Sequence, residues 1–143
     1  MILIKSWLDA EREAYSIRKR VFIQEQGVPE EMELDEYDPA AQHVLAYLNS
    51  ECIGTARLVT LPGSTGKFGR IGRMAVLPIH RRQGIGRELL CALLDLSKSQ
   101  GITQIELHAQ LSAMPFYEQF GFIAQGDIYD EAGIAHRDMI LYI

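Results

Sequence analysis

Residues 74–90 read MAVLPIHRRQGIGRELL and join an expected strand to an expected helix through a turn with two glycines. The apolar run 74–77 is typical of a strand, and Pro78 closes it. Beyond the turn, apolar residues recur at helical spacing as far as Gly101, which ends the pattern. The members of this stripe are Ile85, Leu89, Leu90, Leu93, Leu94 and Leu96. This strand–turn–helix segment decides the fold.

The turn itself predicts an anion site. Gly84 and Gly86 carry no Cβ, so a ligand can approach the backbone closely. The first N–H groups of a helix have no intrahelical acceptor, and the helix dipole adds positive charge beside them. Arg81, Arg82 and Arg87 add formal charge suited to a pyrophosphate. The predicted binding segment is Arg81, Arg82, Gln83, Gly84, Ile85, Gly86 and Arg87.

Two other glycine-rich phosphate sites are excluded by residue identity. A dinucleotide fingerprint requires glycine or alanine where this chain has Leu89. A P-loop requires four residues between its glycines and Ser or Thr after its lysine. The nearest match, Gly63 to Lys67, is too short and is followed by Phe68.

Composition predicts one compact domain spanning residues 1–143. The apolar fraction of 48% is enough for a hydrophobic core. Lys and Arg number 14 against 19 Asp and Glu, and the net charge of −5 disfavours nucleic acid as a partner. No secretory signal or membrane-spanning apolar run is visible, so we expect a cytoplasmic protein without a membrane partner. The histidines and two cysteines show no metal-ligand spacing, so no metal is expected.

The flanking segments predict a mixed α+β fold. We expect strands at 2–5, 43–48, 52–61, 68–77, 102–109, 122–128 and 135–143. We expect helices from a cap at Asp9 to about Gln26, from 85 to 100, and from 113 to 120, with a glycine-rich loop at 62–66. The acidic stretch 30–38 predicts a solvated loop or short helix. The order implies one largely antiparallel sheet flanked by helices, with a βαβ unit in its middle.

The segment Arg81–Gly86 resembles the signature turn of the Gcn5-related N-acetyltransferase (GNAT) superfamily, [Q/R]-x-x-G-x-[G/A]. The segment 74–78 resembles that family's central strand, and 115–122 resembles its second motif, aromatic-Tyr-x-x-x-Gly-Phe. The expected strand order also agrees, so the resemblance covers essentially the whole chain. The front half, with 21–29 and the acidic stretch, is similar to the small bacterial branch of ElaA and YjcF. The branch does not identify a substrate.

The resemblance implies transfer of an acetyl group from acetyl-CoA to an amine in a ternary complex. It places Met74, Ala75 and Val76 against the pantetheine, and it assigns a backbone N–H near Val76 to the acyl carbonyl. Tyr117 matches the tyrosine that protonates the departing thiolate of coenzyme A. With a reference pKa near 10, a tyrosine is protonated at neutral pH. The alternative for Tyr117 is a residue packed against the sheet, and both roles are compatible.

The general base is not identified by the resemblance. Many family members carry a glutamate on the strand before the turn, where this chain has Arg70 and Arg73. The remaining candidates are Glu25, Glu33, Asp35, His43, His108 and His136. His108 shares a strand face with Gln110, and if that face lines the cleft, His108 is the best single candidate. A structural histidine, and water as the proton carrier, remain alternatives.

The acceptor is predicted only as a small-molecule or protein amine. The acidic stretch slightly favours a cationic acceptor, with Glu25, Glu33, Asp35 and Gln110 as candidate substrate-side residues. A non-catalytic acyl-CoA sensor, a longer acyl chain and an oxygen acceptor remain open, because the turn contacts only the pyrophosphate. Homodimers are frequent in the family, which makes the C-terminal strands a candidate dimer interface.

Overall fold

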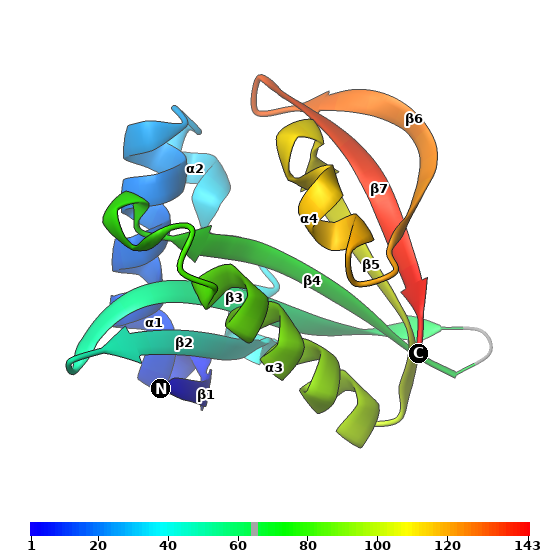
Figure 1. The fold of residues 1–143 in the computed structure, drawn as a ribbon, viewed down its shortest axis with the longest axis horizontal. Coiled ribbons are helices and arrows are strands. Elements are labelled where there is room, and N and C mark those ends of the chain that lie inside the picture. Colours follow the sequence, from blue (N-terminus) through cyan, green and yellow to red (C-terminus); the bar gives the residue numbers. More distant parts are fainter. Residues whose placement is uncertain (64–65) are drawn as a thin grey trace.

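The computed structural model describes residues 1–63 and 66–143 as one mixed sheet flanked by helices (Figure 1). Ser64 and Thr65 of the expected glycine-rich loop lie outside the described residues. The elements in chain order are β1 Ile2–Ser6, α1 Trp7–Arg18, η1 Lys19–Glu25, α2 Glu30–Glu33, η2 Asp38–Ala40, β2 Gln42–Leu48, β3 Glu51–Gly63, β4 Gly66–Val76, η3 Pro78–His80, α3 Ile85–Ser99, β5 Ile102–Gln110, η4 Leu111–Ala113, α4 Met114–Glu118, β6 Ile123–Glu131 and β7 Ile134–Tyr142. The predicted α+β class is confirmed.

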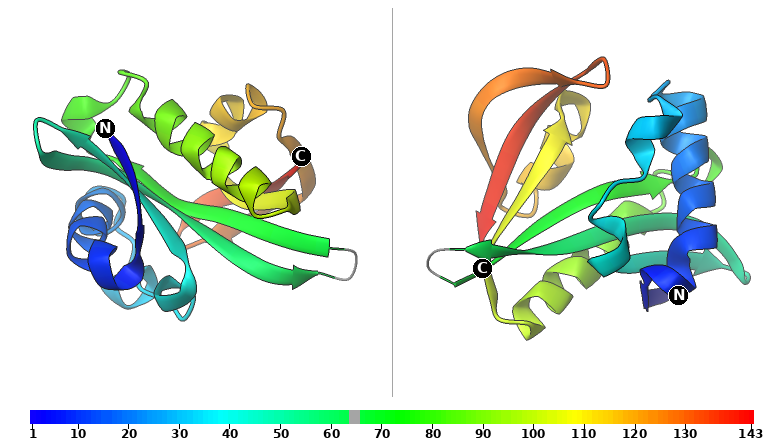
Figure 2. Two further views of the ribbon diagram at one scale, coloured as in Figure 1. Left: turned by 90° about the horizontal axis from the view of Figure 1, so that it is seen from below. Right: turned by 180° about the vertical axis from the view of Figure 1, so that it is seen from behind.

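The sheet has the strand order β1-β2-β3-β4-β5-β7-β6. Every neighbouring pair is antiparallel except β4 and β5, which are joined by α3 and run parallel. This β4–α3–β5 unit is the predicted βαβ crossover. Figure 2 shows α1 and α3 on opposite faces of the β2–β4 region.

The main core lies between α3 and the sheet. Leu89, Leu90 and Leu93 of the predicted stripe are completely buried, and they pack with Ile105 of β5 and Met139 of β7. The helical spacing of these leucines puts them on one face, so burial of that face holds α3 across the sheet.

The parallel pairing of β4 and β5 covers only the first part of β4. The paired residues run from Lys67 opposite Ile102 to Arg70 opposite Glu106. Beyond that point the two strands diverge, as Figure 1 shows. The edge of β4 from Ile71 to Val76 is therefore not paired with β5.

The start and the interior of the first helix differ from the expectation. The helix begins at Trp7 with Ser6 in the N-cap position, so the predicted cap at Asp9 is wrong. Asp9 lies in the first turn, where the negative charge of its carboxylate interacts favourably with the helix dipole. The helical path continues as the π-helix η1 to Glu25 and ends near the expected Gln26.

Candidate active site

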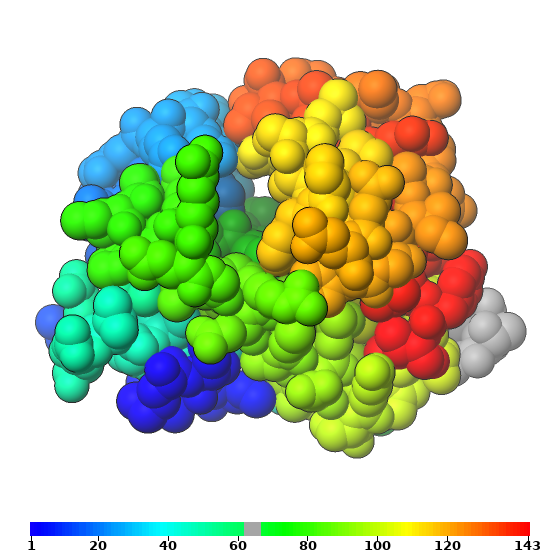
Figure 3. All heavy atoms as spheres, in the orientation of Figure 1, coloured from blue at the N-terminus to red at the C-terminus, as the bar shows by residue number. Residues whose placement is uncertain are grey.

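A cleft of about 870 Å³ lies where β4 and β5 diverge. Residues from the α3 turn line one part of it, and residues from η1, α2, α4 and the β6–β7 hairpin line the rest. In Figure 3 its opening lies between the green segment before α3, the blue N-terminal helices and the yellow β5–α4 region. We call the part at Met74, Tyr117 and the α3 turn the donor half, because the resemblance implies the acyl donor there. We call the part at Arg57, Arg73 and His108 the acceptor half.

The donor half contains the start of α3. Gly84 occupies the N-cap position with φ +83°, a left-handed conformation that glycine adopts without strain. The first intrahelical bond runs from the Glu88 N–H to the Gly84 carbonyl at 3.0 Å. The backbone N–H groups of Ile85, Gly86 and Arg87 precede this bond, as a phosphate site requires. Among residues 1–63 and 66–143, apart from Gly84 and its two chain neighbours, no atom lies within 4 Å of the position that a Cβ on Gly84 would take, so the space beside this turn is open.

The three arginines of the turn have different surroundings. The Arg81 guanidinium donates to both Glu25 carboxylate oxygens at 2.7 and 2.6 Å and to the Val76 carbonyl at 2.9 Å. This pairing lowers the pKa of Glu25. Arg82 is exposed, with φ +64°, and Arg87 lies 4.9 Å from the centre of the Phe120 ring. Arg82 and Arg87 are therefore more accessible to an anion than Arg81, which is tied to η1.

Tyr117 reaches the donor half from α4. Its ring packs against Phe116 and Phe122, at centroid distances of 5.2 and 5.9 Å. Its hydroxyl donates to Met74 Sδ at 3.9 Å. Burial raises the pKa of Tyr117 to about 12, so the hydroxyl keeps its proton at neutral pH. The ring of Tyr117 is therefore packed, as one of the two expected roles requires, and its hydroxyl is directed at Met74 of β4.

A β-bulge shapes β4 beside Tyr117. The register between β3 and β4 shifts between Thr55 and Arg57, and Arg73 on the opposite strand has φ +51°. Bulges increase the local twist and redirect the backbone. Met74, Ala75 and Val76 follow the bulge and line the cleft, which is where a pantetheine chain was expected.

A buried ionic network, which we call the arginine–carboxylate network, holds the wall of the acceptor half. Glu33 and Asp38, from α2 and η2, are only 2% and 1% exposed, so the expectation of a solvated acidic stretch is wrong for them. Arg18 donates to Glu33 Oε1 at 2.7 Å and to Asp38 Oδ1 at 2.8 Å. Arg57 also contacts Asp38, and Asp35 binds Arg57 and Arg73. Each carboxylate has an arginine partner, so burial of these charges is compensated.

Burial and pairing act oppositely on the carboxyl groups of this network. Burial alone would raise the pKa of Asp38, but hydrogen bonds and charge from Arg18, with charge from Arg57, lower it to about 2. For Glu33 burial outweighs its arginine partners, and its pKa is raised. Glu33 and Asp35, expected on the substrate side, therefore serve mainly as partners of arginines. The negative charge expected at the cleft is largely neutralised there.

The histidine candidates have different surroundings: His108 and His136 both line the cleft, with ring centroids 6.2 and 6.0 Å from that of Tyr129, and His43 is not among the lining residues. His43 is 1% exposed, and its Nε2 lies 3.0 Å from the Asp38 carbonyl. His136 is also buried, with Nδ1 2.7 Å from the Ile134 carbonyl. His108 lines the acceptor half, and its Nε2 lies 3.8 Å from Asp138 Oδ1. Tyr129 donates to the same Asp138 oxygen at 2.6 Å. The sequence did not indicate Asp138 or Tyr129, because Asp138 meets His108 through the pairing of β5 with β7, and Tyr129 joins them from β6, which pairs with β7.

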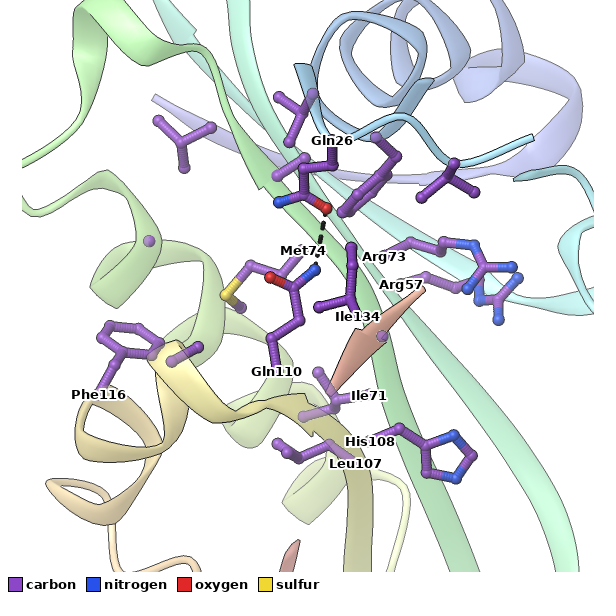
Figure 4. A pocket seen from close by; sticks show the side chains of 18 of the residues that line it. Gln26, Arg57, Ile71, Arg73, Met74, Leu107, His108, Gln110, Phe116 and Ile134 are labelled. Atoms are coloured by element: carbon purple, nitrogen blue, oxygen red, sulfur yellow. Dashed lines mark hydrogen bonds between the residues drawn. The ribbon is translucent and has the colours of Figure 1, made fainter. Parts of the chain in front are cut away.

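Gln110 spans the cleft to reach a residue that the sequence did not indicate. Its Nε2 donates to Gln26 Oε1 at 2.9 Å, and Figure 4 shows this bond as a dashed line near Met74. The expected shared face of His108 and Gln110 on β5 is consistent with both lining the cleft. The Gln26–Gln110 contact joins segments 84 residues apart, so no local sequence pattern could have indicated it.

Within residues 1–63 and 66–143 no group of three His, Cys, Asp or Glu side chains could hold a metal ion. None of the helices in the described part of the chain is long and apolar enough to cross a membrane.

Comparisons with known proteins give a consistent result. The model of the acetyltransferase (GNAT) domain matches residues 9–143. A Bacillus subtilis protein named as an acetyltransferase, BSU40680, is 40% identical over 126 residues, 86% of this chain and 83% of that protein. The uncharacterized N-acetyltransferase YjcF of Bacillus subtilis is 32% identical, and the match covers 90% of each chain. The crystal structure of Escherichia coli ElaA matches with a TM-score of 0.85 at 25% identity, covering 98% of each chain.

Proposed function

The chain belongs to the GNAT family of acyl-CoA-dependent acyltransferases, and we propose that it transfers the acetyl group of acetyl-CoA to a primary amine of a small molecule or protein. Transfer is direct, within a ternary complex. One observation carries the proposal: the start of α3 and the Tyr117 hydroxyl open into the same cleft. The first can hold a pyrophosphate and the second can protonate a thiolate.

Each half of the cleft has its own part in this reaction. The N–H groups at the start of α3, with Arg82 and Arg87, bind the pyrophosphate, and Met74 to Val76 flank the pantetheine. The amine nitrogen forms a bond to the acyl carbon while the carbon–sulfur bond breaks. Tyr117 gives its proton to the leaving sulfur, and His108 takes a proton from the amine on the acceptor side. Holding both reactants in one cleft supplies much of the acceleration.

The proposal is tested first by ligand binding and then by turnover. Saturating acetyl-CoA should raise the melting temperature, because it binds only the folded state. Release of free thiol is then measured with acetyl-CoA and a panel of primary amines. The absence of any thermal shift would refute acetyl-CoA as a ligand. A shift without thiol release from any amine would favour an acyl-CoA sensor.

Tyr117→Phe tests the assigned acid. We expect acetyl-CoA to stabilise the variant as it does the wild type, because the ring still packs. The rate of thiol release should fall by about 10²–10⁴, the usual contribution of a positioned acid. Tyr142→Phe is the matched control, since Tyr142 is 70% exposed. An unchanged rate in Tyr117→Phe would remove Tyr117 from the mechanism and leave the rest of the proposal standing.

A further inference from the structure

Two glutamine side chains bridge the cleft between elements that are distant in sequence. Gln26 caps the C-terminal end of η1, and Gln110 is the last residue of β5. Their carboxamides meet at 2.9 Å from opposite sides of the cleft (Figure 4). We call this contact the glutamine bridge.

Both ends of the glutamine bridge are fixed by regular backbone structure. The Gln26 N–H donates to the Val21 carbonyl at 3.1 Å, which closes the end of η1. Gln110 is paired with His136 in the β5–β7 ladder. These backbone contacts fix the position of the glutamine bridge in the cleft.

The glutamine bridge lies next to the expected position of the thioester. Tyr117 contacts Met74 through its hydroxyl and Sδ. Met74 lines the same cleft as Gln110 and Gln26, and it is drawn next to them in the view of Figure 4. In the same view His108, Arg57 and Arg73 lie on the other side of Ile134. An acyl group held at Tyr117 and Met74 therefore faces the two carboxamides, while the side at His108 remains for the amine.

We propose that the glutamine bridge limits the acyl group to a short chain and thereby selects acetyl-CoA among acyl-CoA thioesters. The inference rests on the proposed function, because it assumes that the thioester lies at Met74. A methyl group fits in front of the bridge. A longer chain must separate the two carboxamides and lie against them, and half-buried amides that lose their partner disfavour that complex.

Binding of an acyl-CoA series tests the proposal without knowledge of the amine. Dissociation constants of acetyl-CoA, butanoyl-CoA and hexanoyl-CoA are measured by calorimetry. The wild-type protein should bind hexanoyl-CoA about tenfold or more weakly than acetyl-CoA, the discrimination expected when a half-buried amide loses its hydrogen-bond partner. Gln110→Ala and Gln26→Ala should reduce this ratio of dissociation constants, hexanoyl-CoA over acetyl-CoA, to about threefold or less. Gln110→Met keeps the side-chain length and should reduce the ratio as well.

Matched controls separate the bridge from a general effect of removing glutamines. Gln104→Ala changes the same residue type on β5, and Gln24→Ala does so on η1; neither residue lines the cleft. Both controls should keep the wild-type ratio. The double variant Gln26→Ala with Gln110→Ala should lower the ratio of dissociation constants hardly more than either single change. Each single change already removes the same hydrogen bond.

The outcomes distinguish the inference from the proposed function. Equal binding of all three thioesters by the wild type would overturn the bridge as a length limit and leave an acyl-CoA-dependent enzyme with a broad donor range. Fully additive effects in the double variant would also overturn it, because they would indicate two independent side chains. Failure of every thioester to bind would refute the proposed function and the inference together.

Discussion

The two halves of the cleft are stabilised in different ways. The donor half is built from backbone N–H groups at a helix start, with Arg82 and Gly84 exposed to solvent. The arginine–carboxylate network forms the wall of the acceptor half, and its residues Arg18, Glu33 and Asp38 are at most 2% exposed. Residues of the donor half can therefore be changed with effects mainly on ligand binding. Changes in the acceptor half should first affect whether the protein stays folded.

Arg18→Ala should have the largest effect, on stability. It removes the shared partner of Glu33 and Asp38 and leaves two buried carboxylates with incomplete compensation. Breaking a buried ion pair in this way typically costs about 3–5 kcal/mol of unfolding free energy. Urea denaturation followed by circular dichroism measures the loss. Arg12→Ala, at an exposed position of the same helix, should change stability by less than about 0.5 kcal/mol. A similar small change in Arg18→Ala would contradict the importance of the network.

Gly84→Val should have the next largest effect, now on the donor half. A branched residue is strained at φ +83°, and its side chain would enter the space in front of the α3 N–H groups. We expect acetyl-CoA affinity to fall by about 100-fold or more and unfolding free energy to fall by about 1–2 kcal/mol. Calorimetry and urea denaturation measure the two effects separately.

Gly86→Ala is the matched control for the turn. A Cβ at residue 86 would meet the Phe116 ring at an ordinary contact distance of 3.7 Å. Alanine also favours a helix over glycine by about 0.5–1 kcal/mol, so this variant should be as stable as the wild type or more so. If Gly84→Val bound acetyl-CoA as tightly as Gly86→Ala, the turn would not be the phosphate site.

The contrast between the halves also explains what the sequence could predict. The α3 turn, the leucine stripe and the order of strands depend on residues close together in the chain, and the structure confirms the fold class they predicted. The arginine–carboxylate network joins Arg18 to Glu33, Asp35 to Arg57 and Asp38 to Arg57. Such pairs are specified by the packing of α1 and α2 on the sheet, and spacing alone does not reveal them. The acidic stretch therefore looked solvated, although its key carboxylates are buried.

The fall of unfolding free energy at low pH tests the arginine–carboxylate network. The folded-state pKa of Asp38 is lowered from 3.8 to about 2, so its stabilisation is present above pH 3.8 and is lost as the pH falls through 2. The contribution is about 2 kcal/mol by linkage. Glu33 acts in the opposite sense, because burial raises its pKa and the folded protein holds its proton more readily. Asp38→Asn should therefore flatten the fall of unfolding free energy between about pH 4 and 2. An unchanged slope in denaturation curves would contradict the low pKa of Asp38.

Glu25→Gln should have the smallest effect, and it sharpens the description of the donor half. The Arg81–Glu25 ion pair is more than one-third exposed on both sides, so its loss should change stability little. Without the carboxylate, Arg81 is released from η1 and can turn toward the pyrophosphate of acetyl-CoA. We expect affinity to rise by about two- to fivefold at low salt, with a smaller gain at high salt because the charges are screened. Glu31→Gln makes the same charge change at another exposed position. An equal gain there would attribute the effect to net charge, and no gain in either variant would show that Arg81 does not contribute to acetyl-CoA binding.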